Sequence, residues 1–309
     1  MKKLIYPVLS LLLLLWYSAC SNGDDDRPEI PTAVDKTANL RGTGESAQDM
    51  LVNTDFTEIL VEIAYVRGFR PTQEAMDSFV EYLKRHTFKE NINFIYTELE
   101  SPEEDSLTLD EIAELESDNR TAYNNGETLA VYIYFTDAPA EDDEEEEGLV
   151  TLGAVYRNTS MIVHEATVRR LAAQSIFISN ADVEASTINH EFGHLFGLVN
   201  LGTAPVNDHE DIQRDAEGEP VLNDSGNTQG NSHCNVEGCL MSAELQFGGP
   251  SNKIGSDPTA KNLSGLTAGC RLSGKSLLKM LASNAAKGNS LAPNLDSECI
   301  LDLQSVGGR

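Results

Sequence analysis

The sequence predicts a mixed α/β (α+β) protein, with a mixed twisted sheet and a long apolar helix followed by a loop-rich, cysteine-bearing C-terminal subdomain. Between residues 51 and 200, segments rich in β-branched and aromatic residues alternate with segments of helical periodicity. Beyond residue 201, turn-forming residues dominate, and four of the five cysteines lie there. Hydrophobic residues make up 40% of the chain, enough for a sizeable core.

The elements follow in order from alternating or helical spacing of apolar side chains. Strands are predicted at residues 56–66, 92–96, 129–135 and 149–156, with a short one at 175–179. Helices are predicted from an N-cap at Thr72, at residues 108–123 and 163–173, and from a cap at Asn180 or Asp182. The acidic block at residues 141–147 predicts a solvated loop between strands.

Charge excludes several classes of protein. The chain has 22 Lys and Arg against 50 Asp and Glu, a formal net charge of −28. Binding to nucleic acid needs clustered cationic side chains, so no nucleic-acid partner is expected. Binding to anionic lipid through a basic patch is excluded for the same reason. The apolar run at residues 9–16 is too short to span a bilayer as a helix.

The N-terminus has the layout of an export signal. A basic start, an apolar segment and a small-residue step at residues 18–19 predict a signal peptide over residues 1–19. Cys20 follows at once, and this arrangement resembles the lipobox of bacterial lipoproteins. We therefore expect lipidation of Cys20, a polar tether over residues 20–50, and membrane attachment only through this lipid. The predicted location is the cell envelope, as an outer-membrane lipoprotein exposed at the surface.

The remaining cysteines are even in number, which in an exported chain favours disulfides. A zinc site built from all four thiolates is the competing interpretation, but such sites usually contain two close pairs of cysteines. Only one close pair is present. The possible disulfides therefore involve Cys234, Cys239, Cys270 and Cys299.

Residues 190–197 have the sequence HEFGHLFG, which contains the candidate metal-binding and catalytic residues. On a helix, His190 and His194 project from one face, one turn apart, so that two imidazole nitrogens can reach one Zn²⁺. Glu191 lies just beside that face, where a carboxylate can hold the water bound to the metal. Gly197 lets the helix end there. We predict a zinc site with His190 and His194 as ligands and Glu191 as the catalytic residue.

These residues resemble the metzincin metallopeptidase signature HExxHxxGxxH, with Asn200 where the third ligand stands. Residues 233–241, HCNVEGCLM, resemble the archaemetzincin branch, in which the third histidine directly precedes a cysteine. That match implies His233 as the third ligand and Met241 as the methionine of the Met-turn. His209 lies nearer the helix end and remains the alternative third ligand. The later CxxC of archaemetzincins, which helps to hold a second zinc, has no counterpart here.

The resemblance implies a metzincin-like fold and a zinc-dependent endopeptidase that cleaves a peptide or protein substrate with metal-activated water and Glu191 as general base. On this interpretation residues 51–200 form an N-terminal subdomain ending in the active-site helix. Residues 201–309 form a C-terminal subdomain with the third ligand and the Met-turn. The alternatives are a non-catalytic, surface-anchored binding lipoprotein on the same scaffold, and a zinc hydrolase of non-peptide amides.

Overall fold

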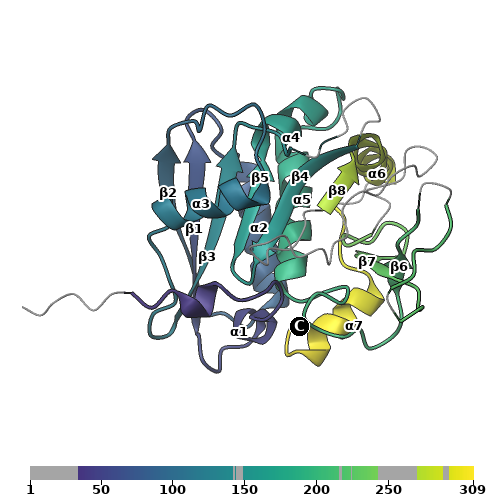
Figure 1. Cartoon of the computed structure of the whole chain (residues 1–309), viewed down its shortest axis with the longest axis horizontal. Helices are drawn as coiled ribbons and strands as arrows, with labels where there is room; N and C mark the ends of the chain where they lie inside the picture. The colour runs from purple at the N-terminus through teal and green to yellow at the C-terminus, as the bar shows by residue number, and fades with distance from the viewer. Residues whose placement is uncertain are drawn as a thin grey trace, which may run out of the picture. The chain divides into compact units, whose positions relative to one another are not determined.

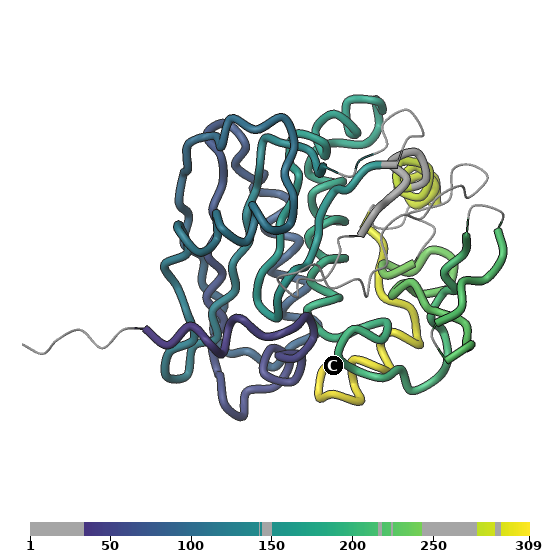
Figure 2. Tube along the Cα trace, viewed as in Figure 1, coloured from purple at the N-terminus to yellow at the C-terminus, as the bar shows by residue number. Residues whose placement is uncertain are grey.

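The structure is a computed structural model, shown as a cartoon in Figure 1 and as a Cα trace in Figure 2. It describes residues 34–141, 143, 149–215, 218–223, 225–242, 270–287 and 292–309. The predicted signal peptide, Cys20 and most of the acidic block lie outside these residues. Asp35–Arg309 forms one compact unit.

The main sheet has six strands in the order β2-β1-β3-β5-β4-β8. The first four are mutually parallel, whereas β4 pairs antiparallel with both β5 and β8. The prediction of a mixed α/β fold is confirmed, with a mostly parallel central sheet. The strands are β1 (Glu58–Val66), β2 (Asn91–Leu99), β3 (Thr128–Thr136), β4 (Leu149–Arg157), β5 (Ser160–His164) and β8 (Cys270–Ser273).

Apolar side chains cover both faces of this sheet because its central strands are buried on both sides. On β3, Val131 and Ile133 belong to the larger core, which includes Phe192 of α5. Tyr132 points to the opposite face, where a smaller core includes Ile112 of α3. The helices of this region are α2 (Gln73–His86), α3 (Leu109–Asn119), α4 (Glu165–Ala172) and α5 (Asn180–Leu195).

The remaining elements are short. A small antiparallel ladder joins β6 (Glu210–Ile212) to β7 (Gly230–Cys234). Two helices lie near the C-terminus, α6 (Gly274–Lys287) and α7 (Ser297–Ser305), and two precede β1, η1 (Thr37–Asn39) and α1 (Ala47–Leu51). Among the described residues, no helix combines the length and apolar character that a membrane span requires.

The sequence predictions fail mainly after β4. Residues 163–173 were expected to be helical throughout, but a strand, β5, runs to His164 before α4 begins. All five residues of β5 are buried, so the spacing of its apolar side chains does not distinguish a buried strand from a helix. The short strand predicted at residues 175–179 is a loop, because Ser179 there caps α5. Asn180 and Asp182 are helical residues and not the cap.

Candidate metal centre

The helix α5 positions the predicted site, and local hydrogen bonds define both of its ends. At its start, Ser179 and Asp182 form a reciprocal capping box. At its end, the N–H of Gly197 donates to His194 O and that of Leu198 to Gly193 O. Gly197 has a φ of +79°, a left-handed conformation that closes such a helix end. The helix therefore ends at Leu195, one residue after the second histidine.

Three histidines converge at this helix. The Nε2 atoms of His190 and His194 lie 3.2 Å apart, and a ring nitrogen of His233 on β7 lies within 4.8 Å of both. Two nitrogens bound to one tetrahedral zinc, each about 2.0–2.1 Å from it, would stand roughly 3.3 Å apart. The Nε2 atom of His233 has no hydrogen-bond partner among the described residues. The donor set therefore fits a divalent metal ion.

Backbone carbonyls orient two of these rings. The Nδ1 atom of His190 lies 2.7 Å from Leu240 O, and that of His233 lies 2.8 Å from Asn231 O. Each Nδ1–H donates to its carbonyl, which leaves Nε2 as the lone-pair nitrogen that a metal requires. Burial lowers the pKa of His190 to about 3, and it lowers the pKa values of His194 and His233 as well. The three rings are therefore neutral at physiological pH.

Glu191 is fully buried beside these rings, and neither carboxylate oxygen has a hydrogen-bond partner among the described residues. An unpartnered carboxylate in the interior is costly, and burial raises the pKa of Glu191 to about 8. Its Cγ packs against Gly153 of β4 so closely that a Cβ there would lie 2.8 Å away. Gly153 is a site residue that the sequence analysis missed, since a lone strand glycine carries no local signal.

Met241, predicted from the sequence as the methionine of a Met-turn, packs against α5. Its side chain is fully buried, and a Cβ added to Gly193 would lie 2.4 Å from its Sδ. Gly193 therefore lets the methionine approach α5 between the two helical histidines. Asn200, at the third-ligand position of the sequence signature, donates from Nδ2 to Glu210 Oε2 at 3.1 Å instead.

His209, the alternative third ligand, is engaged elsewhere. Its Nε2 lies 2.7 Å from Asp302 Oδ2, and its Nδ1 lies 3.3 Å from Cys234 Sγ. The structure thus brings His233, and not His209, to the two histidines of α5. His209 instead links α7 to a second cluster.

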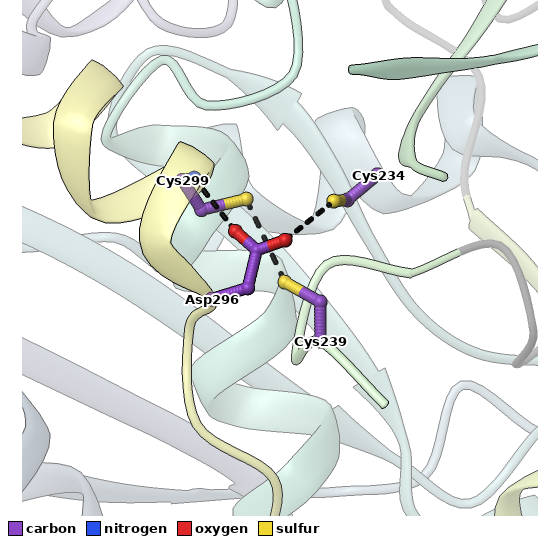
Figure 3. A group of neighbouring side chains, drawn as sticks. All are labelled: Cys234, Cys239, Asp296 and Cys299. Atoms are coloured by element: carbon purple, nitrogen blue, oxygen red, sulfur yellow. Dashed lines mark hydrogen bonds between the residues drawn. The ribbon is translucent and has the colours of Figure 1, made fainter. Parts of the chain in front are cut away.

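That second cluster consists of Cys234, Cys239, Asp296 and Cys299, whose side chains point toward one another in Figure 3. Cys239 Sγ and Cys299 Sγ lie 3.6 Å apart, too far for a disulfide, and all three cysteines are free thiols. The disulfides predicted for these three are therefore not formed. Their predicted partner Cys270 begins β8, and no disulfide to it is formed by the three. The prediction relied on an even count, which says nothing about distance.

The second cluster can hold a metal ion. Two thiolates bound to one tetrahedral zinc at about 2.3 Å would stand roughly 3.8 Å apart, close to the observed 3.6 Å. Hydrogen bonds from Cys234 and Cys299 lower the pKa of the Cys239 thiol well below its usual range, which favours the ligating thiolate. Asp296 caps α7 by accepting from Cys299 N at 2.8 Å.

Asp296 was not predicted as a ligand from the sequence. Disulfides were preferred to a zinc site there because the sequence has only one close pair of cysteines, whereas the structure places a carboxylate beside the thiol three residues later. Because both are possible zinc ligands, an Asp-x-x-Cys spacing near the C-terminus was the available signal.

The fold and the site together define a mixed α/β protein whose buried helix presents two of three histidines that could hold a metal ion, with a glutamate next to them in the chain. No family model and no curated protein matches the chain. Among solved structures, archaemetzincin from Methanopyrus kandleri is similar at 14% identity and a TM-score of 0.42, covering 81% of this chain and 96% of that one. Metalloproteinase-II from Bacteroides fragilis is similar at 12% identity and a TM-score of 0.30, covering 58% and 51%. Both TM-scores are below 0.5.

Proposed function

We propose that this chain is a zinc-dependent peptidase of the metzincin type. One observation carries the proposal: three neutral imidazoles place their ring nitrogens within 4.8 Å of one another, and Glu191, next to His190 in the chain, has a buried carboxylate without a hydrogen-bond partner among the described residues. His190, His194 and His233 would hold the ion. A zinc ion bound there supplies a Lewis acid that polarises a carbonyl and acidifies water.

Glu191 would move the protons. Its carboxylate has no hydrogen-bond partner among the described residues, so it is free to accept a proton from the attacking water. The same group can then deliver that proton to the leaving amine of the cleaved peptide. The backbone acceptors of His190 and His233 hold the two rings in one orientation, so that no ligand has to rotate during the reaction.

We assign the second cluster a structural role in this enzyme. Its ligands join β7 and the following turn to α7, and Cys234 directly follows His233 in the chain. A metal held there would fix the strand that carries the third histidine. Structural zinc sites contribute directly to folding in this way.

The test compares Glu191→Gln with the wild-type protein on a mixed, denatured protein substrate, with and without a chelator. We expect Glu191→Gln to lose hydrolysis while zinc content, measured by mass spectrometry, stays at the wild-type level. Glu184→Gln is the matched control, because Glu184 is also a buried glutamate of α5, about two turns away. Full activity of Glu191→Gln would refute the assigned base.

The third ligand is tested by metal content. His233→Ala should lose the ion bound by α5, whereas His209→Ala should keep it, because His209 contacts the second cluster. The reverse result would make His209 the ligand. If zinc-loaded protein cleaves small amides or esters but no peptide, the alternative hydrolase is the correct function, and cleavage of none of them favours the binding scaffold.

Lipidation of Cys20 and a place at the cell envelope are proposals from the sequence alone, because residues 1–33 lie outside the described part of the chain. Mass spectrometry of the protein from membranes would show the acyl groups. Cys20→Ser should release the protein into the soluble fraction.

A further inference from the structure

The edge of the main sheet beside Glu191 is already occupied. Gly153 of β4 packs directly on Glu191, so β4 is the strand that borders the catalytic carboxylate. One side of β4 pairs with β5, and the other pairs antiparallel with β8. In the register of that pairing Cys270, the first residue of β8, lies opposite Gly153. Figure 1 shows β4 and β8 side by side, with α6 next to them.

An extended peptide can bind a protein by adding a strand to a sheet edge, where backbone N–H and C=O groups are unpaired. The other edge of this sheet is β2, four strand spacings from β4, or about 19 Å. A peptide bound at β2 could not place its backbone at Glu191. Of the two edges in the described sheet, the one that suits a substrate is therefore the one that β8 covers.

The site is also closed. His190, Glu191 and His194 have no exposed surface, and His233 is 3% exposed. A peptide bond cannot reach these groups unless a neighbouring segment moves away. β8 is suited to such a movement because it has four residues and, within the described part of the chain, pairs with a strand on one side only.

The next element keeps β8 close to this edge. α6 follows β8 without a break, and its Leu277 and Leu281 are buried in the larger core. A tethered strand competes with a free peptide at a high effective concentration, of the order of millimolar for a short tether. Substrate would therefore bind well only when β8 leaves the edge.

We propose that β8 is an autoinhibitory strand: residues 270–273 occupy the β4 edge at which the peptide substrate pairs, and they hold the enzyme latent. The proposal rests on the proposed peptidase function. It implies that release of β8, by a partner or by cleavage of the chain, increases activity without any change at the metal ligands.

The test weakens the pairing of β8 without altering its connection to α6. Along a strand, successive N–H groups point in opposite directions, so a double variant Arg271→Pro with Leu272→Pro removes an N–H directed at β4. A milder double variant, Arg271→Gly with Leu272→Gly, weakens the strand without a steric clash and serves if the prolines prevent folding. Ile95→Pro on β2, the opposite edge strand, is the matched control.

The variants are compared with the wild type by hydrogen exchange, by binding of a peptide hydroxamate and by kcat/KM. All three are measured on the zinc-loaded proteins, and hydrogen exchange is also measured on the metal-free proteins. We expect faster exchange of the β4 amides, about tenfold tighter binding of a fluorescent peptide hydroxamate, and about tenfold higher kcat/KM in the β8 variants. A tenfold change corresponds to about 1.4 kcal/mol. Ile95→Pro should leave the binding and the kcat/KM at wild-type values.

Equal hydroxamate affinity and equal kcat/KM in the wild type and in both β8 variants would overturn the autoinhibitory role, while the peptidase function would stand. If no zinc-loaded form, with β8 paired or released, cleaves a peptide, the proposed peptidase function itself is wrong.

Discussion

Gly153→Ala tests whether the close contact between β4 and α5 positions the catalytic carboxylate. The added Cβ would lie 2.8 Å from Glu191 Cγ, 3.0 Å from Thr187 Cγ2 and 3.1 Å from Ile162 O. Carbon atoms in ordinary contact are about 3.5–4.0 Å apart. The new methyl group cannot retreat toward β5, because the carbonyl of Ile162 blocks it. Glu191 must therefore give way by roughly 0.7 Å, the difference between 2.8 Å and the shorter contact limit.

That displacement sets the expected magnitude. A misplacement of 1 Å in an active site can cost about a hundredfold in rate, so a loss of between tenfold and a hundredfold in kcat/KM is expected, about 1.4–2.7 kcal/mol. Overpacking also costs about 1–3 kcal/mol of stability. The usual gain of about 0.5–1 kcal/mol from replacing a strand glycine with alanine offsets part of that cost.

The assay measures kcat/KM on a peptide substrate, zinc content, and the free energy of unfolding in urea. Zinc content should not change, because Gly153 contacts the glutamate and not the histidines named as ligands. Gly42→Ala is the control, since its Cβ would meet only the end of the exposed Glu45 side chain. Wild-type kcat/KM in Gly153→Ala would refute the argument that this contact positions Glu191.

The remaining predictions concern the second cluster and a buried carboxylate pair. We expect two zinc ions per chain, and Cys239→Ser should lose one of them. Its free energy of unfolding should fall by about 4 kcal/mol at a free zinc concentration 1,000-fold above Kd. An unchanged zinc stoichiometry by mass spectrometry would contradict the cluster. Burial and the nearby Glu184 raise the pKa of Glu165 to about 9 from an ordinary 4.5, so the folded chain keeps a proton that the unfolded chain releases. Stability should therefore be highest below pH 4.5 with respect to this group and fall toward pH 9, by up to about 1.4 kcal/mol per pH unit. Glu165→Gln should flatten that slope in urea unfolding between pH 5 and 9, and an unchanged slope would exclude Glu165 as its source.

Much of the fold follows from local sequence patterns. The strand at residues 129–135 and the helix capped by Thr72 are confirmed, because alternation and capping act over a few residues. β5 was missed because all five of its residues are buried, so they show no alternation between buried and exposed positions. The strand also leads directly into a helix. The loop at residues 175–179 was mistaken for a strand because Ile176 and Phe177 are residue types common in strands, although both are exposed in the structure and Ser179 caps the next helix.

Helical spacing alone predicts the pair of histidines and the adjacent glutamate, because residues four apart on a helix share a face. The choice between His233 and His209 follows from the three-dimensional structure, because it depends on contacts between segments that are distant in the chain. The same reason applies to the thiol cluster, whose Asp296 and Cys234 are 62 residues apart in the chain. It applies also to β8, because a strand's partner is set by the edge available to it and not by its own residues.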